Sequence, residues 1–275
     1  MKKIECLSLF DFTCNICGTT NRWDIQKAHR EVPSCDGCGS TPRFRGLMAV
    51  LSMFLYDGKI KVMNDVKPNP KIKGLGMSEW EGYGKILDKK YTFLNTFYHT
   101  EPFLDISGPT VPPYCGLDFV ICTEVFEHID LPLERAFSNL WHLLKPGGCL
   151  IFSVPYTDLD HSIEYYPDLY EHQCVNFKDE WILVNRTAEK KYEVYSNLSF
   201  HGGPGSTLER RFFCEKDMVN YLKGAGFTDL EIHDSPHLAC GFYWTPITLK
   251  PPIINGEGFG PDLNCPAHIV SARKY

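Results

Sequence analysis

The sequence has no apolar run approaching the ~20 residues that a helix needs to span a bilayer. Its first residues include two lysines but no long apolar core and no small-residue cleavage site, so we expect no signal peptide. Basic residues are outnumbered, 28 against 34 acidic ones, and the net charge is −6. Tight binding to a phosphate backbone needs clustered Lys and Arg. The sequence therefore predicts a cytoplasmic protein without a membrane segment, for which nucleic acid is an unfavourable partner.

A disulfide framework is also missing, although the chain has 12 cysteines. Most of them are isolated within apolar segments, such as Cys122, Cys149 and Cys240. In a reducing cytosol such thiols pack as small hydrophobic side chains. The length of 275 residues and the hydrophobic content of 43% suffice for one α/β domain of ordinary size and a small appendage.

Four cysteines have a different setting, because they form two Cys-x2-Cys pairs in polar, turn-forming sequence. They are Cys14, Cys17, Cys35 and Cys38, and each pair is followed by glycine. Two such pairs supply four thiolates that can converge tetrahedrally on one zinc ion, and four protein ligands leave no open position for water. The spacing therefore predicts a structural zinc site. Four unrelated thiols and a redox pair are the alternatives, and Cys6 is a weaker substitute ligand.

The cysteine pairs predict a division of the chain into two parts. A module of about 40 residues buries little core, so zinc binding would fold it. We expect this zinc-binding module at residues 1–45 and the main domain at residues 46–275. Leu47, Val50, Leu51 and Phe54 lie on one face of a helix that connects the two.

Residues 118–155 predict a strand–helix–strand unit. Phe119 to Cys122 form an apolar strand that ends at Thr123 and Glu124. Apolar residues with helical spacing follow, with Asp130 as the expected N-cap, and Lys145 to Gly148 should stop the helix. A second apolar strand runs from Leu150 to Val154. The two strands should be parallel and joined by a right-handed crossover.

This unit resembles the class I S-adenosylmethionine-dependent methyltransferases, in particular the large type 11 group. In that group a strand with a polar end is followed by a Val-Leu/Phe-Glu-His run and by a helix that closes on Leu-Lys-Pro-Gly-Gly. The matching residues are Val125 to His128 and Leu144 to Gly148. The chain is also similar, from Cys14 to about Val270, to bacterial methyltransferases whose cysteine module ends as Cys38 to Arg45 do here. Another doubly wound α/β enzyme is the alternative.

The resemblance implies an α/β fold with a doubly wound, mostly parallel, Rossmann-like sheet of seven strands, the last of them antiparallel, preceded by a small zinc ribbon. It also implies S-adenosylmethionine as cofactor. In the family a glycine turn after the first strand passes under the methionine portion of the cofactor, and Gly74 and Gly76 correspond to it. The later glycines are replaced here. Ser78 would then bind the cofactor carboxylate and Glu79 its ammonium group.

Six further positions correspond to the cofactor site of the family. Asn95 and Thr96 stand where an acidic residue usually binds the ribose. A third strand is expected at residues 102–106, and it places Asp105 where an acid lies near the adenine amino group. A turn-capping role is an equal alternative for Asp105. Ile106 would donate a backbone N–H to the adenine ring. Thr123 and Glu124 lie at the carboxyl end of a strand, where open α/β sheets bind ligands.

A long irregular insertion at about 156–212, rich in Tyr, His, Asp and Glu, should bind the acceptor. Residues 181–184 and 191–195 within it predict a hairpin, and residues 244–261 predict a loop over the active-site face. His128, His172 and His201 are the candidate bases, because histidine titrates near neutral pH. Packing or loop-bracing roles are the alternatives for each of them. Glu209 would orient one of them or pair with a neighbouring arginine.

The sequence therefore predicts a methyltransferase that acts on a small molecule or a sugar, with transfer to oxygen favoured. Methyl transfer from a sulfonium is an in-line displacement, in which the protein mainly aligns the acceptor and removes its proton. One alternative is an RNA-modifying methyltransferase that holds RNA through the basic edge of the zinc module; another is a non-catalytic protein that binds the cofactor. Three roles stay open for the zinc module. It would join two chains in a homodimer, cap the main domain or contact a partner.

Overall fold

The computed structural model describes residues 9–109, 112–244, 247–249, 253–254, 257–258 and 263–275. Its centre is a six-stranded sheet with the order β15-β20-β6-β5-β3-β4. The strands are β3 (Lys73–Met77), β4 (Thr92–Thr96), β5 (Leu117–Thr123), β6 (Leu144–Ser153), β15 (Phe227–His233) and β20 (Ile269–Lys274). Strands β4, β3, β5 and β6 are mutually parallel, as predicted, and β20 is antiparallel to both β6 and β15.

A seventh strand is not present among the described residues. The segment expected to supply it, residues 102–106, contributes one isolated parallel bridge between Phe97 and Phe103. Two backbone hydrogen bonds hold this bridge, from Phe97 N to the Pro102 carbonyl and from Leu104 N to the Phe97 carbonyl. The chain then turns at Asp105, so the predicted strand is reduced to this single bridge.

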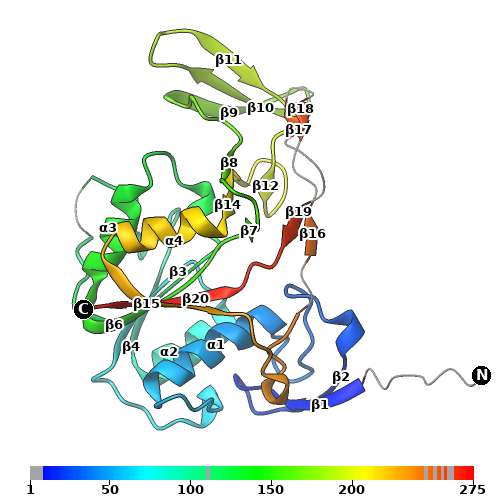
Figure 1. The fold of residues 1–275 in the computed structure, drawn as a ribbon, viewed down its shortest axis with the longest axis vertical. Helices are drawn as coiled ribbons and strands as arrows, with labels where there is room; N and C mark the ends of the chain where they lie inside the picture. The colour runs from blue at the N-terminus through cyan, green and yellow to red at the C-terminus, as the bar shows by residue number, and fades with distance from the viewer. Residues whose placement is uncertain (1–8, 110–111, 245–246, 250–252, 255–256, 259–262) are drawn as a thin grey trace, which may run out of the picture.

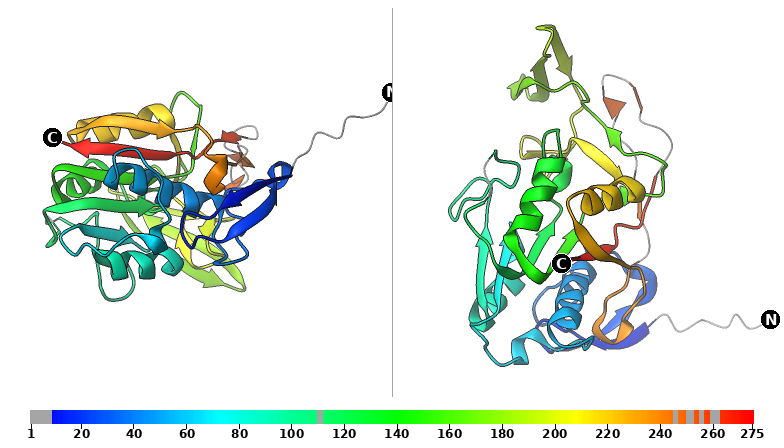
Figure 2. Two further views of the ribbon diagram at one scale, coloured as in Figure 1. Left: turned by 90° about the horizontal axis from the view of Figure 1, so that it is seen from below. Right: turned by 60° about the vertical axis from the view of Figure 1, so that its left-hand side comes forward.

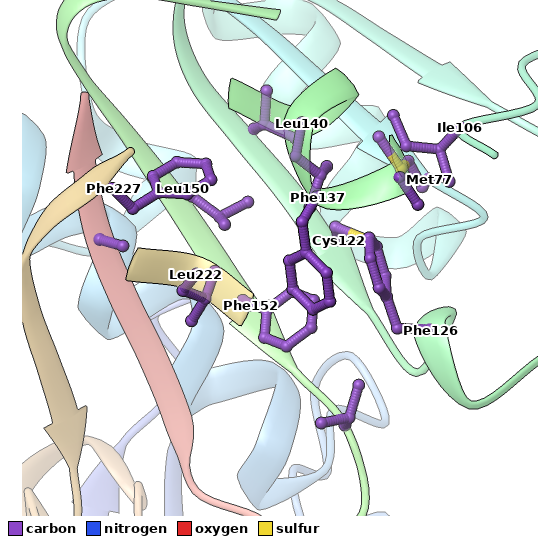
Figure 3. Packing of buried hydrophobic residues seen from close by; sticks show 14 of the residues in the cluster. Met77, Ile106, Cys122, Phe126, Phe137, Leu140, Leu150, Phe152, Leu222 and Phe227 are labelled. Carbon is purple, nitrogen blue, oxygen red and sulfur yellow. The ribbon is translucent and has the colours of Figure 1, made fainter. Parts of the chain in front are cut away.

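Helices cover both faces of the sheet. Figure 1 shows α1 (Pro42–Leu55) and α2 (Glu81–Lys90) on one face, and α3 (Glu134–Leu143) and α4 (Glu215–Gly224) on the other. A separate hydrophobic cluster lies on each face. Figure 3 shows the cluster on the α3 face, where Phe137 lies near Phe126 and Phe152, with ring centroids 4.3 and 5.8 Å away. The predicted doubly wound α/β arrangement is therefore confirmed for this sheet.

The strand–helix–strand unit differs from the prediction at both ends of its helix. The N-cap of α3 is Leu133, without a side-chain cap, and Asp130 pairs instead with Arg210. Asp130 lies four residues before the first helical residue, too far to cap it, so the expected capping role was wrong. At the other end α3 stops at Leu143, and the Leu-Lys-Pro-Gly-Gly motif, Leu144 to Gly148, is itself the first part of β6.

The amino-terminal module packs on the α1 face of the sheet. Its strands β1 (Leu9–Thr13) and β2 (Thr20–Asp24) form an antiparallel pair, and a 3-10 turn follows at Ile25–Lys27. Helix α1 begins at Pro42 behind the N-cap Thr41, whose Oγ1 accepts a hydrogen bond from Phe44 N. This helix crosses the predicted boundary at residue 45. A Cβ at Gly46 would lie 2.6 Å from the Ile269 side chain, so the helix and β20 are in close contact.

The insertion forms small sheets beyond the carboxyl end of the central sheet. Strands β9 (Glu171–Phe177), β10 (Glu180–Arg186) and β11 (Tyr192–Tyr195) form an antiparallel sheet that projects from the body (Figures 1 and 2). The predicted hairpin is its β10–β11 pair. Nearer the body, β14 (Arg211–Cys214) pairs with β7 (Tyr156–Thr157) and β8 (Ile163–Glu164), and β12 (Phe200–His201) pairs with β13 (Thr207–Leu208).

The predicted loop at residues 244–261 lies largely outside the described residues. Its described strands are β16 (Ile247–Leu249), which pairs with β19 (Leu263–Cys265), and β17 (Ile253–Ile254), which pairs with β18 (Glu257–Gly258). Among the helices that the structure describes, none combines the length and the hydropathy of a membrane span.

Candidate functional site

The four cysteines of the module converge. Their sulfur atoms all lie within 4.8 Å of one another. Cys14 Sγ is 3.8 Å from Cys38 Sγ, and Cys17 Sγ is 3.6 Å from Cys35 Sγ. A zinc ion with tetrahedral Zn–S bonds of about 2.3 Å places its sulfurs about 3.8 Å apart. The donor set and its spacing therefore fit one zinc ion.

Backbone and side-chain donors surround these sulfurs. Gly18 and Gly39 have positive φ, and the N–H groups of the residues after them, Thr19 and Ser40, lie against Cys17 and Cys38. Ser40 Oγ also lies 3.4 Å from Cys14 Sγ. A hydrogen bond with Cys38, which outweighs the opposing effect of burial, lowers the pKa of Cys14 to about 4. Burial raises the pKa of Cys17, and the hydrogen bond with Cys14 raises that of Cys38, so Cys14 is the sulfur favoured as thiolate, the form that binds zinc.

Arg45 lies buried next to the cysteine cluster. Its guanidinium donates to the Ser40 carbonyl at 2.7 Å, to Ser34 Oγ at 2.8 Å and to the Gly241 carbonyl at 3.0 Å. It also lies over the Phe12 ring, 4.5 Å from its centroid. Burial lowers its pKa, and the nearby cysteines oppose that shift. Arg45 thus offsets the negative charge of the thiolates and joins the module to Gly241, in the segment that follows β15.

The glycines of β3 are surrounded by protein side chains. A Cβ at Gly74 would lie 2.1 Å from the Phe119 ring, so packing within the sheet requires this glycine. A Cβ at Gly76 would lie 2.7 Å from Glu79 Cγ and 3.0 Å from Asn95 Oδ1. The space under the turn after β3 is therefore occupied by Glu79 and Asn95.

The turn after β3 places Ser78 and Glu79 at the carboxyl edge of the sheet. Ser78 has φ +58°, a conformation typical of glycine. The Glu79 carboxylate is buried and accepts hydrogen bonds from the Tyr83 hydroxyl and from Thr123 Oγ1, the latter at 3.0 Å. Burial raises the pKa of Glu79 to about 7, although these hydrogen bonds oppose the shift.

The predicted ribose and adenine residues make local contacts. Asn95 bonds the backbone of Glu79 twice, with Nδ2 to the carbonyl at 2.8 Å and Oδ1 to the N–H at 3.0 Å. Thr96 Oγ1 donates to the Gly76 carbonyl. Asp105 Oδ1 accepts from Ser107 N and Oγ, so Asp105 does cap a turn, and its second oxygen can accept a further hydrogen bond. The Ile106 side chain is buried beside Met77 (Figure 3).

The end of β5 joins the sheet to the amino-terminal module. Glu124, at φ +53°, accepts hydrogen bonds from Arg30 Nη2 at 2.9 Å and from Ser153 Oγ at 2.7 Å. Burial alone would raise the pKa of Glu124, but Arg30 and Arg43 lower it to about 2. A residue of the module is therefore bound to a carboxylate at the edge where the family binds its ligands.

The 3-10 turn η3 (Phe126–His128) follows at once and carries two further titratable groups. Glu127 is 1% exposed, and neither of its carboxylate oxygens has a hydrogen-bond partner among the described residues. Burial and the neighbouring Glu124 raise its pKa well above the usual value. His128 Nδ1 lies 2.8 Å from the Leu208 carbonyl, so this nitrogen carries the proton and Nε2 has a free lone pair. Burial lowers the pKa of His128, which keeps the imidazole neutral at pH 7.

The structure brings two of the three candidate histidines together. The ring centroids of His128 and His201 lie 5.7 Å apart, and His128 Nε2 is 3.7 Å from Glu127 Oε1. His172 lies apart, in a hollow of about 450 Å³ on the β9–β10–β11 sheet, with its Nε2 3.1 Å from Arg210 Nη1. Glu209 orients no histidine by direct contact among the described residues; it accepts a hydrogen bond from Ser199 Oγ.

Two consecutive arginines of the insertion hold this turn. Arg210 donates its N–H to the Glu127 carbonyl at 2.8 Å and its Nε to the His128 carbonyl at 2.7 Å. Arg211 is buried, and its Nη1 donates to the carbonyls of Phe126 and Ile129. Every backbone carbonyl from residue 126 to 129 is therefore bonded to Arg210 or Arg211.

Sequence reasoning missed the roles of Glu127 and Arg30. Glu127 entered only as part of the family motif, although the spacing Glu124-x-x-Glu127-His128 places two carboxylates and an imidazole after one strand. Arg30 was considered only as part of a basic edge of the module. No signal in a single sequence connects Arg30 with Glu124, because 94 positions separate them.

A family model described as a methyltransferase domain matches residues 73–232, which is more than half of the chain. None of the curated proteins compared with the chain matches it. Solved structures similar to it include an S-adenosylmethionine-dependent methyltransferase from Clostridium acetobutylicum, with 14% identity, TM-score 0.35 and 74% and 83% of the two chains covered. Another is the Burkholderia thailandensis 1,6-didemethyltoxoflavin-N1-methyltransferase, with 13% identity, TM-score 0.40 and 83% and 76% covered.

A glycopeptide N-methyltransferase is also similar, with 12% identity, TM-score 0.39 and 84% and 94% of the two chains covered. At these scores the structural likeness carries no argument of its own, and the assignment rests on the family match. The chain belongs to this methyltransferase-domain family and is an S-adenosylmethionine-dependent methyltransferase.

Proposed function

We propose that the protein transfers the methyl group of S-adenosylmethionine to a hydroxyl oxygen of a small molecule or a sugar. The observation that carries the choice of a hydroxyl is the neutral, oriented imidazole of His128 at the carboxyl end of β5. An alcohol oxygen must lose its proton during transfer, so it needs a group of this kind nearby. The acceptor oxygen attacks the methyl carbon, the C–S bond breaks with its electron pair left on sulfur, and the proton passes to Nε2.

The residues that would hold the cofactor lie along the carboxyl edge of β3, β4 and β5. Asp105 has a carboxylate oxygen for the adenine amino group, and the backbone of Ile106 follows it. Ser78 and Thr123 lie at the methionine end. Glu79 is already bound to Tyr83 and Thr123, so it would bind an ammonium group only by exchanging one of those contacts. When bound, the cofactor supplies the activated methyl group, and these residues orient it.

The insertion, at about residues 156–212, would bind the acceptor. It places His201 against His128, while Arg210 and Arg211 fix the turn that carries Glu127 and His128. An RNA acceptor is less well supported, because three of the four arginines of the module are bonded within the protein: Arg30 to Glu124, Arg43 to Glu31, and Arg45 in the interior, which leaves exposed Arg22 as the fourth.

We also propose that Cys14, Cys17, Cys35 and Cys38 bind a structural zinc ion that folds residues 1–45 into a module. The module would act as a cap that delivers Arg30 to Glu124. The free thiols of the described cysteines suit a reducing cytoplasm, where we expect the protein to reside. A homodimer stays a prediction.

The test is methyl transfer to a panel of alcohols, sugars and amines, with S-adenosylhomocysteine and the methylated product both measured. Active acceptors should yield methyl ethers, and His128→Ala should lower kcat by roughly 10²–10⁴-fold, the usual contribution of a base. Calorimetric titration of the same variant with S-adenosylhomocysteine is the control, since cofactor affinity should stay unchanged. Products methylated only on nitrogen, or full activity of the variant, would refute the proposal of transfer to oxygen.

A further inference from the structure

Glu127, His128 and His201 form a cluster of three ligand-type side chains from two segments far apart in the sequence. One ligand atom of each, a carboxylate oxygen and two imidazole nitrogens, lies within 4.8 Å of the others. Two atoms bonded to one ion at about 2.1 Å each lie at most about 4.2 Å apart. His201 is exposed, so a small rotation of its side chain closes that difference.

The strongest reason to expect a ligand here is the state of Glu127. Its side chain is 1% exposed, and both of its oxygens lack a partner among the described residues. A buried carboxyl group without a hydrogen bond is costly whether it is ionised or neutral, because it has lost its hydration and gained nothing. A bound cation would satisfy both oxygens.

The charges around Glu127 also favour a cation. Glu124 directly follows β5, three residues before Glu127, and Glu209 directly precedes the arginines that hold η3, so neighbouring carboxylates add negative charge near the site. Arg30 is the positive charge that opposes them, and it is already bonded to Glu124. On the other side, Arg210 uses Nε for the His128 carbonyl and Nη1 for Asp130. Within the described part of the chain, the basic side chain that pairs with Glu127 is thus His128, with Nε2 3.7 Å from Oε1, and His128 is itself a ligand-type group.

The two histidines are arranged by one hairpin, β12–β13. The carbonyl of Leu208 in β13 accepts the Nδ1 proton of His128, which fixes Nε2 as the free nitrogen. Leu208 pairs with Phe200 in β12, and the next residue of β12 is His201. Such a hydrogen bond from the outer nitrogen is the usual support of a metal-binding histidine. The hairpin therefore supplies one ligand and orients the other.

We propose that Glu127, His128 and His201 bind a divalent transition-metal ion. Two imidazoles and one carboxylate suit ions such as Mn²⁺, Fe²⁺, Co²⁺ or Zn²⁺ and leave coordination positions open. The role of the ion rests on the proposed transfer to a hydroxyl oxygen, but the ion takes over from His128 the task of removing the proton. It would hold the acceptor oxygen and make its proton acidic enough to leave to water. His128 would then be a ligand of the ion. The acceptor oxygen would attack the methyl carbon, and the C–S bond would break with its electron pair left on sulfur.

The test is titration of the full-length, zinc-loaded protein with Mn²⁺. Binding is measured as the loss of the electron paramagnetic resonance signal of free Mn²⁺. Mn²⁺ prefers oxygen and nitrogen ligands, so it leaves the cysteine site to zinc. We expect one Mn²⁺ per chain, and more than tenfold weaker binding in Glu127→Gln and His201→Ala. His161→Ala is the matched control, since His161 is an exposed histidine of the same insertion, and its affinity should equal that of the wild type.

The absence of Mn²⁺ binding to folded protein, or equal affinity in His201→Ala and the wild type, would overturn the proposal. Circular dichroism of each variant establishes that it is folded, and exposed His201 can be replaced without opening the core. Neither cofactor nor acceptor is present in the titration. A failure of metal binding is therefore separate from a failure of methyl transfer, which is measured by product formation.

Discussion

Replacing Glu79 with glutamine should remove the contribution of this carboxyl group to the pH dependence of unfolding between about pH 5 and pH 8. The carboxyl group is fully buried, and its pKa is raised from 4.5 to about 7. Between these values the unfolded chain has released the proton that the folded protein keeps, so stability falls as pH rises. A difference of about 2.5 pKa units corresponds to about 3 kcal/mol, all of it present below pH 4.5 and lost as pH passes 7.

The assay is urea unfolding of the protein without cofactor at several pH values. The glutamine side chain would keep an oxygen that accepts from Tyr83 and Thr123, and it has no charge to desolvate. The difference in unfolding free energy between the wild type and the variant should therefore fall by about 2–3 kcal/mol from pH 5 to pH 8, because other shifted groups contribute equally to both. Glu81→Gln is the control, because Glu81 is 77% exposed and should leave the pH profile unchanged. Parallel profiles for the wild type and the Glu79→Gln variant would refute the reasoning.

Three further predictions concern the scaffold of the site. Cys35→Ser should abolish the one zinc ion per chain that metal analysis should find in the wild type, and should lower the melting temperature, because zinc folds the module. Arg211→Ala should cost about 3–5 kcal/mol of unfolding free energy, because Glu164 loses its ion-pair partner and the carbonyls of Phe126 and Ile129 lose the guanidinium; Arg186→Ala, in a half-exposed pair, should cost less than about 1 kcal/mol, and equal losses would contradict this view. Gly74→Ala should cost at least about 1–3 kcal/mol in urea unfolding through its clash with Phe119, whereas Gly84→Ala in α2 should be neutral or stabilising, so a harmless Gly74→Ala would contradict the packing account.

The sequence was sufficient to predict the order of strands and helices in the central sheet. Apolar runs such as Phe119 to Cys122 are uninterrupted, and the apolar residues of α3 recur with clear helical spacing. In these elements the local pattern and the tertiary packing agree. The four cysteines were predictable for a similar reason, because the ligand spacing of a zinc site is local. The prediction of a third strand was wrong, because residues 102–106 form one bridge at Phe103 and then turn at Asp105.

The candidate site was predictable only in part, because its parts meet through long-range contacts. Pattern placed Glu124 and His128 at the end of a strand, and the insertion could be identified as irregular and rich in polar groups. Nothing in the spacing indicates that Leu208 orients His128 or that Arg30 reaches Glu124. The glycine positions of β3 were interpreted by analogy with the family, whereas Gly74 has a packing reason that only the Phe119 ring reveals.

Under the proposed role of the insertion in acceptor binding, the attachment of η3 to it limits which segments can be exchanged. Arg210, Arg211 and Leu208 hold the turn that carries Glu127 and His128, so a graft that exchanged residues 156–212 as a block would also release that turn. The β9–β10–β11 sheet projects from the body, and its strands pair only with one another among the described segments. Residues 171–195 are therefore the natural unit for exchange between relatives, while residues 207–211 must be inherited together with the motif at residues 124–128.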